Sequence, residues 1–132
     1  MTRKVNQYKL HTPPGSFHAF KVLIAAEYNH INIIVPDSFD AELILAKSPT
    51  GKGPLLEVSS NSEFSHFISE SNVIARYIAK LDRASSIMGE NITEESKISA
   101  WMDWCKNELE LPACIWWYPV VGYTKFQSSV YV

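Results

Sequence analysis

The order of apolar runs at the start of the chain restricts its fold more than any other feature. Alternating residues at 7–11 predict a short strand, which Thr12-Pro13-Pro14-Gly15 breaks. A helix is predicted next, from Phe17 to Tyr28. Its apolar positions follow helical spacing: Phe17, Phe20, Leu23, Ile24 and Tyr28. The β-branched run 31–35, ended by Pro36, predicts a buried strand, which completes a unit of the size of βαβ.

The following segment predicts two more strands and another helix. Residues 41–46 are a candidate short helix, and a polar turn follows at 48–54. The apolar runs 55–58 and 64–68 flank a Ser/Asn-rich turn and predict a β-hairpin. Ser71 is predicted to cap the next helix. That helix carries one apolar face: Val73, Ile74, Tyr77, Ile78 and Leu81. A βαβ unit followed by ββα is the thioredoxin-like α/β plan, and we assign it residues 1–82.

The remainder of the chain predicts a linker and a helical region. Residues 83–92 are polar and predict the linker, and 93–132 form the second region. Thr93 is expected to open its helix, with Glu94 and Glu95 in the first turn, where negative charge suits the helix dipole. The predicted apolar stripe is Ile98, Trp101, Met102, Cys105 and Leu109. Pro112 is expected to end or kink this helix before the aromatic run 115–121.

This second region carries more apolar surface than it can bury by itself. Trp101, Trp104, Trp116 and Trp117 are the tryptophans of the chain. They predict core or interface packing, because large exposed apolar patches usually mark a partner or further chain. We therefore expect the front part of a larger two-domain design.

Composition excludes several classes of function. The chain has 132 residues, is 46% apolar and carries a net charge of −2, which fits a folded domain without a broad nucleic-acid footprint. No apolar run approaches the ~20 residues that span a bilayer, and the start lacks the apolar core of a signal peptide. The histidines His11, His18, His30 and His66 show no metal-ligand spacing, so no metal site is predicted. Cys105 and Cys114 predict reduced thiols in a cytosolic protein, although a single disulfide stays open.

Two separated motifs predict one ligand site. The loop Gly51-Lys52-Gly53-Pro54 precedes the predicted hairpin, and Glu70-Ser71 opens the helix after it. A helix N-terminus presents unpaired N–H groups that suit a carboxylate, and Glu70 beside it could accept an ammonium. Together they suit a small molecule that carries both charges. The simpler role for Glu70 and Ser71 is helix capping, and for Lys52 a solvated loop position.

These motifs resemble the cytosolic glutathione transferase superfamily, and within it the head region of the elongation factor 1-gamma family. The resemblance rests on residues 19–28, 47–54, 70–77 and 101–119, and it spans about residues 8–123. The run Leu111-Pro112-Ala-Cys-Ile-Trp-Trp-Tyr-Pro119 discriminates best, because the other motifs are common to the superfamily. The implied fold is a thioredoxin-like domain followed by the beginning of an all-α C-terminal domain.

The resemblance also implies roles for individual residues. It implies a cis bond before Pro54, and glutathione contacts from Lys52, Gly53, Pro54, Glu70 and Ser71. Gly53 departs from the branched apolar residue usual there, which loosens the expected ligand alignment. Ser16 falls where a catalytic hydroxyl would stabilise the glutathione thiolate, but an N-cap serine is the alternative. Tyr8 is a weaker candidate and is expected to pack in the first strand.

The implied function is binding rather than chemistry. The family resemblance implies a cytoplasmic scaffold in translation elongation that anchors the nucleotide-exchange subunit of elongation factor 1, with a homodimer as a further option. No cofactor is required in this interpretation, and glutathione is an optional ligand. Neither direct nucleic-acid binding nor a membrane is expected. Two alternatives stay open: a glutathione transferase that conjugates the thiolate to electrophiles, and a fragment with neither activity.

Overall fold

A computed structural model describes residues 6–60, 64–82 and 85–125. The chain divides into two compact units, Met1–Met88 and Gly89–Val132, and each is considered by itself. The boundary between Met88 and Gly89 lies inside segment 83–92, which is the linker predicted from the sequence. Within the described ranges, no helix combines the length and apolar character needed to cross a membrane.

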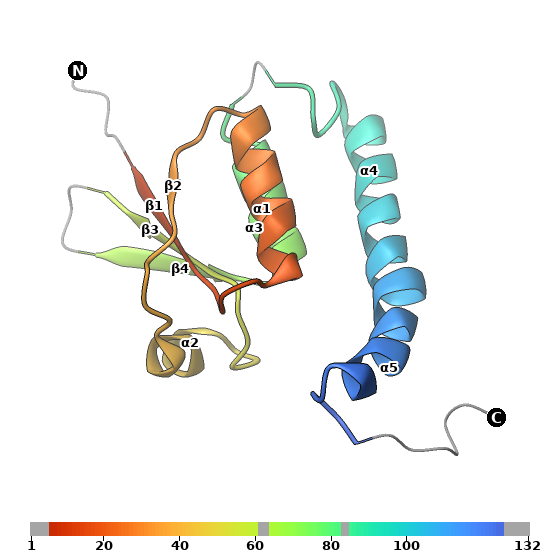
Figure 1. Cartoon of the computed structure of the whole chain (residues 1–132). Coiled ribbons are helices and arrows are strands. Elements are labelled where there is room, and N and C mark those ends of the chain that lie inside the picture. Colours follow the sequence, from red (N-terminus) through yellow and green to blue (C-terminus); the bar gives the residue numbers. More distant parts are fainter. Residues whose placement is uncertain (1–5, 61–63, 83–84, 126–132) are drawn as a thin grey trace. The chain divides into compact units, whose positions relative to one another are not determined.

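The first unit is built on a mixed four-stranded sheet of order β2-β1-β3-β4 (Figure 1). The strands are β1 (Gln7–His11), β2 (Ile33–Ile34), β3 (Leu55–Ser59) and β4 (Ser65–Ser69). Strand β1 runs parallel to β2 and antiparallel to β3, which is antiparallel to β4. The predicted thioredoxin-like sheet is therefore confirmed.

Strand β2 is shorter than the predicted strand 31–35. Its residues pair only with β1, at the edge of the sheet. The backbone N–H of Ile31 donates instead to the Ala26 carbonyl, 2.9 Å away, and so completes the end of the preceding helix. The apolar run thus serves two elements, which periodicity alone does not reveal.

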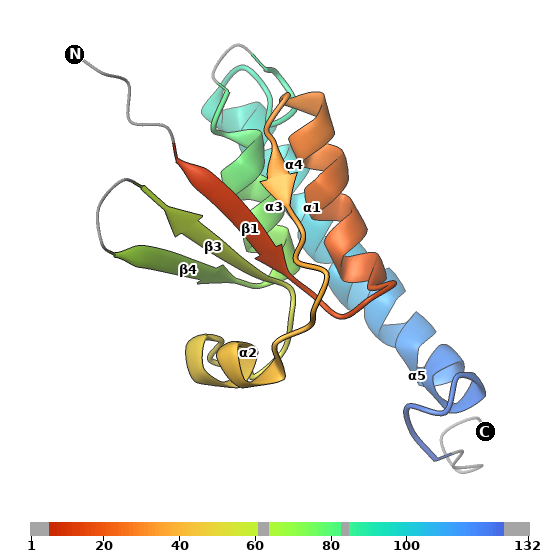
Figure 2. The same ribbon diagram turned by 60° about the vertical axis from the view of Figure 1, so that its left-hand side comes forward.

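Three helices accompany this sheet: α1 (Phe17–Tyr28), α2 (Ala41–Lys47) and α3 (Ser71–Ala79). Helices α1 and α3 pack side by side against one face of the sheet (Figure 2). The short helix α2, predicted at 41–46, is confirmed, and the Asp40 carboxylate caps it by accepting from the Leu43 N–H at 2.9 Å. The fully buried side chains come from β1, β3, α1 and α3: Leu10, Val22, Leu55, Leu56, Ile74 and Ile78.

The predicted helix 17–28 is confirmed as α1, and small side chains form its buried face. Its buried residues are Ala19, Val22 and Ala26. The large apolar side chains whose spacing predicts the helix are exposed instead, Phe17 by 45%, Phe20 by 54%, Ile24 by 58% and Tyr28 by 69%. Small residues on α1 and α3 explain this choice, because alanines let two helices approach closely. On α3, Asn72 is buried. Val73 is exposed, although it belongs to the apolar face predicted for this helix.

Polar side chains join α1 to α3 at both ends of their contact. The Asn29 side-chain amide, buried at the end of α1, donates to the carbonyl oxygens of Ile78 and Ala79, each at 2.9 Å. Toward the start of α3, the Lys21 ammonium donates to Asn72 Oδ1 at 3.0 Å. Because the last carbonyls of a helix lack partners inside it, Asn29 supplies a donor to the Ala79 carbonyl and a second donor to the Ile78 carbonyl, which also accepts from the Leu81 N–H at 3.2 Å.

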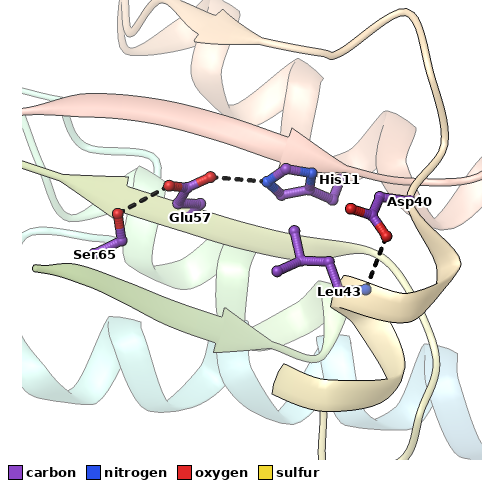
Figure 3. Close-up of polar contacts among 5 residues, drawn as sticks. All are labelled: His11, Asp40, Leu43, Glu57 and Ser65. Atoms are coloured by element: carbon purple, nitrogen blue, oxygen red, sulfur yellow. Dashed lines mark hydrogen bonds and ion pairs between the residues drawn. The ribbon is translucent and has the colours of Figure 1, made fainter.

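The opposite sheet face carries a polar chain, drawn in Figure 3. Glu57 on β3 accepts from Ser65 Oγ at 2.9 Å and pairs with His11 Nε2 at 3.0 Å. Burial raises the pKa of Glu57, but the hydrogen bonds from His11 and Ser65, with the charges of Lys9 and His11, outweigh it and lower the pKa. The carboxylate therefore stays ionised while it links three strand positions.

The second unit is a succession of helical segments: α4 (Ile92–Trp104), the π-helical η1 (Cys105–Glu110) and α5 (Leu111–Val120). Helix α4 begins at Ile92, one residue before the expected start at Thr93. Asn91 caps it, since its Oδ1 accepts from the N–H groups of Thr93 and Glu94 at 3.1 Å. Gly122 ends α5 with a positive φ of 80°, and the Tyr123 N–H reaches back to the Tyr118 carbonyl.

Pro112 does not end the helix, contrary to one of the two predicted outcomes. In a regular α-helix its ring would meet the carbonyl of Glu108, four residues earlier. The wider π-helical turn directly before α5 relieves that conflict, and the aromatic run continues as helix. The predicted apolar stripe extends over α4 and η1, and none of its residues is buried. Both cysteines are free thiols.

The Asn29 contacts give a direct test of how α1 and α3 are held together. We expect Asn29→Ala to lower the free energy of unfolding by about 1–3 kcal/mol, because the Ala79 carbonyl loses its donor and the Ile78 carbonyl loses one of two. Asn32→Ala, which removes the same amide from an exposed position, should change it by less than about 0.5 kcal/mol. Urea denaturation followed by circular dichroism measures both, and equal effects would contradict the assigned role.

Candidate functional site

The sheet register brings the predicted ligand residues to one end of the sheet. Leu55 pairs with Ser69 of β4 and with His11 of β1. Pro54 directly precedes Leu55, and Glu70 directly follows Ser69, so these two residues emerge side by side. The loop 12–16 leaves the sheet at the same end, after His11. Motifs that lie far apart in sequence therefore converge, as the hairpin prediction requires.

The Gly53–Pro54 peptide bond is cis, as predicted. Pro54 is buried at the start of β3, whereas the Lys52 side chain is exposed. The Lys52 carbonyl accepts a hydrogen bond from Ser48 Oγ at 3.0 Å, and this bond restrains the backbone of the loop 48–52. This contact fixes the backbone and leaves the Lys52 ammonium exposed.

Gly53 occupies a position with little room for a side chain. A Cβ atom there would lie 3.2 Å from Ile44 Cδ1 on α2 and 3.3 Å from Pro13 Cδ. The departure from a branched apolar residue therefore has a packing reason: α2 and the loop after β1 close over this backbone. Close packing, rather than flexibility, is what the glycine provides here.

Glu70 has an unusual backbone conformation with a φ of +72°. It is the N-cap residue of α3, so the prediction that Ser71 caps this helix was wrong: Ser71 is its first residue. The Glu70 side chain makes no capping hydrogen bond, although its carbonyl accepts from the Ile74 N–H at 2.9 Å. A non-glycine residue at positive φ is strained, and such strain clusters at ligand sites.

Ser16 stands at the N-cap of α1, yet its hydroxyl makes no capping bond. It lines a cavity of about 240 Å³ between the loop after β1, helix α1 and the loop after β2. The hydroxyl is thus not used by the helix that it precedes. Tyr8 instead packs edge-on against Tyr77 of α3, with ring centroids 6.5 Å apart, as expected for a strand residue.

The convergence suits a zwitterionic ligand. The first N–H groups of α3 lack acceptors within the helix, and Glu70 supplies a carboxylate beside them. Lys52 adds an exposed positive charge on the neighbouring loop. Across the residues that the structure describes, no group of three metal-ligating side chains comes together. The ligand roles of these residues stay predictions.

Sequence reasoning missed the residues that complete the Ser16 cavity. Asp37 and Phe39, in the loop after β2, line it together with Phe20 of α1. Nothing in the local pattern signals this: the loop is an ambiguous polar stretch, and Phe20 reads as core by periodicity. Only the parallel pairing of β1 with β2 brings the two loops to one place.

The Glu70 conformation can be measured as a difference between two variants. Glu70→Gly and Glu70→Ala both remove the carboxylate, but only glycine adopts a positive φ without steric conflict. We expect the glycine variant to be more stable than the alanine variant by about 1 kcal/mol. Thermal unfolding of both variants checks this, and an alanine variant of equal or greater stability would show that the backbone is unstrained.

No protein-family model matches the chain. Among curated proteins, the chain is 36% identical over 120 residues to elongation factor 1-gamma 3 from rice, Oryza sativa. That match covers 86% of this chain and 28% of the relative. Elongation factor 1-gamma from Artemia salina is 35% identical over 92% of this chain and 28% of its own length. The chain thus spans less than a third of these relatives.

The solved structures similar to this chain are glutathione transferases. A nematode-specific enzyme from C. elegans matches with a TM-score of 0.74 and 21% identity, over 96% of this chain and 58% of its own. Omega 2S from Trametes versicolor matches with a TM-score of 0.67 and 18% identity, over 80% and 49%. At such identities the likeness shows the fold, a thioredoxin-like domain joined to part of a helical one. The chain belongs to the elongation factor 1-gamma family and corresponds to its glutathione-transferase-like N-terminal region.

Proposed function

We propose that this chain acts in translation elongation as a cytoplasmic scaffold that anchors the nucleotide-exchange subunit of elongation factor 1. The observation that carries the proposal is the match to elongation factor 1-gamma proteins at 31–36% identity over about nine-tenths of the chain. Because the chain spans under a third of those relatives, the role assigned here is that of one region within a larger assembly.

The surface of the second unit supports a binding role. Trp101 is 66% exposed, Trp116 is 67% exposed, and Trp104 and Trp117 are each about half exposed. Trp101 and Trp104 also stack edge to face, with centroids 5.6 Å apart. Tryptophan is enriched among residues that dominate interface energetics, because burial of its large ring contributes strongly to association. These side chains thus form a suitable anchor for an apolar partner segment.

A pull-down with the N-terminal region of the exchange subunit tests the proposal. We expect the chain to retain that region, and Trp116→Ala to weaken the interaction by roughly 30-fold or more if Trp116 is a dominant contact. Lys97→Ala, an exposed change in the same unit, is the matched control and should bind as the parent does. Absence of retention by the parent chain would overturn the proposal.

Light scattering on the same samples separates the homodimer from the partner complex. If a second copy covers these tryptophans, the parent chain has the mass of a dimer and Trp116→Ala has the mass of a monomer. The exchange subunit, which is proposed to bind the same tryptophans, would then compete with dimer formation.

A glutathione transferase activity is the second candidate, favoured by one observation. The Ser16 hydroxyl is free of its helix and lines a cavity at the sheet end where Pro54 and Glu70 emerge. A hydroxyl that donates to a thiolate stabilises the charged nucleophile and so lowers the thiol pKa. In this reaction the glutathione sulfur would attack an electrophile, and the leaving group would depart with its electron pair.

Conjugation of glutathione to a chloronitrobenzene acceptor tests this candidate. We expect Ser16→Ala to lower kcat/KM by roughly 100-fold if its hydroxyl activates the thiol, while glutathione binding stays near the parent value. Thr12→Ala, which removes another hydroxyl from the same cavity wall, is the control. Turnover that Ser16→Ala leaves unchanged would remove this mechanism.

A further inference from the structure

The cavity beside Ser16 has walls that the predicted glutathione contacts do not share. Its lining comes from segments 12–16 and 35–39 and from one side of α1. Neither the loop at 51–54 nor Glu70 and Ser71 contribute to it. Ser16, the candidate catalytic residue, is the one predicted site residue in the lining, so the glutathione prediction leaves the part of the cavity around Phe20, Asp37 and Phe39 unexplained.

The chemistry of the walls is apolar and aromatic with a single charge. Phe20 of α1 and Phe39 of the loop after β2 supply two phenyl rings, and Pro13 and Pro36 add further apolar surface. Asp37 is the only titratable residue in the lining. No hydrogen bond or ion pair of its carboxylate is found among the residues that the structure describes.

This combination favours an organic cation over other ligands. The faces of phenyl rings carry negative charge density and attract cations, most effectively weakly hydrated ammonium groups with apolar substituents. An unpaired carboxylate adds an attraction of the same sign, and it repels anions. A purely apolar ligand would pack against the rings and prolines but would have no electrostatic attraction to the Asp37 carboxylate.

The volume limits the size of the ligand. At about 240 Å³ the cavity lies below the roughly 300–1,000 Å³ typical of sites for drug-sized molecules. It exceeds the ~30 Å³ share of a single water molecule several-fold. A small alkylated ammonium head fits between these limits.

We infer that this cavity binds a small alkylammonium group, with Phe20 and Phe39 against its methyl groups and Asp37 as counter-charge. The inference is independent of the scaffold function, because all lining residues belong to the first unit. The same head group occurs on free small molecules and on alkylated lysine side chains, and both present the same charge and methyl surface.

Titration of the full chain with choline, followed by amide chemical shifts in NMR spectra, tests the inference. We expect saturable shifts at Gly15, Ser16, Asp37 and Phe39. The uncharged isostere 3,3-dimethylbutan-1-ol should bind roughly fivefold or more weakly, because it has the same shape without the charge. A short peptide that contains trimethyllysine, in a parallel titration, tells whether a side chain reaches the site as well as a free molecule.

Two variants separate charge from ring contacts. Asp37→Asn and Phe39→Leu should each weaken choline binding by roughly two- to fivefold, because both contacts are partly exposed to solvent. Glu27→Gln removes one exposed acid elsewhere on α1 and should leave the affinity unchanged. Equal affinity for choline and its isostere, equal effects of Asp37→Asn and Glu27→Gln, or no saturable shift with either probe would overturn the inference.

Discussion

The buried amide of Asn29 is the contact on which the arrangement of the first unit depends. It ties the end of α1 to the last carbonyls of α3, and the Lys21–Asn72 bond holds the other end of the pair. With both ends fixed, the alanines of the two helices are buried and the helix pair packs on the sheet. Leu10 and Leu56 of the sheet and Ile74 of α3 are fully buried. Because buried polar groups must be paired, this bond selects one helix packing over its rotated alternatives.

That packing has a consequence at the surface. Once small residues occupy the contact between α1 and α3, the large apolar residues of α1 must point outward. The tryptophans of the second unit are exposed as well, so both units present apolar surface that suits association. The scaffold role proposed above would place these exposed side chains against partners. One of these exposed residues, Phe20, also lines the cavity beside Ser16.

Much of the candidate site could be predicted from the sequence, because its motifs lie at the ends of well-marked elements. The hairpin 55–59/65–69 brings Pro54 next to Glu70, and the cis bond before Pro54 was expected from family resemblance. Helix starts were less predictable: Glu70 holds the cap position expected for Ser71, and α4 begins at Ile92 rather than Thr93. Several neighbouring polar residues can serve as a cap, and backbone conformation decides among them. The cavity was not foreseeable, because its walls come from three segments without a local signal.

The sequence by itself determined the order of elements, the mixed sheet and the family, because strand alternation, helix periodicity and turn residues act over short range. Only the tertiary structure decided which face of each helix is buried. On α1 both faces are apolar, so periodicity could not choose between Val22 with its alanines and the larger Phe20 and Ile24. Close approach to α3 favoured the small side chains. The same holds for Pro112, where a π-helical turn accommodates the ring within a continuing helix rather than ending it.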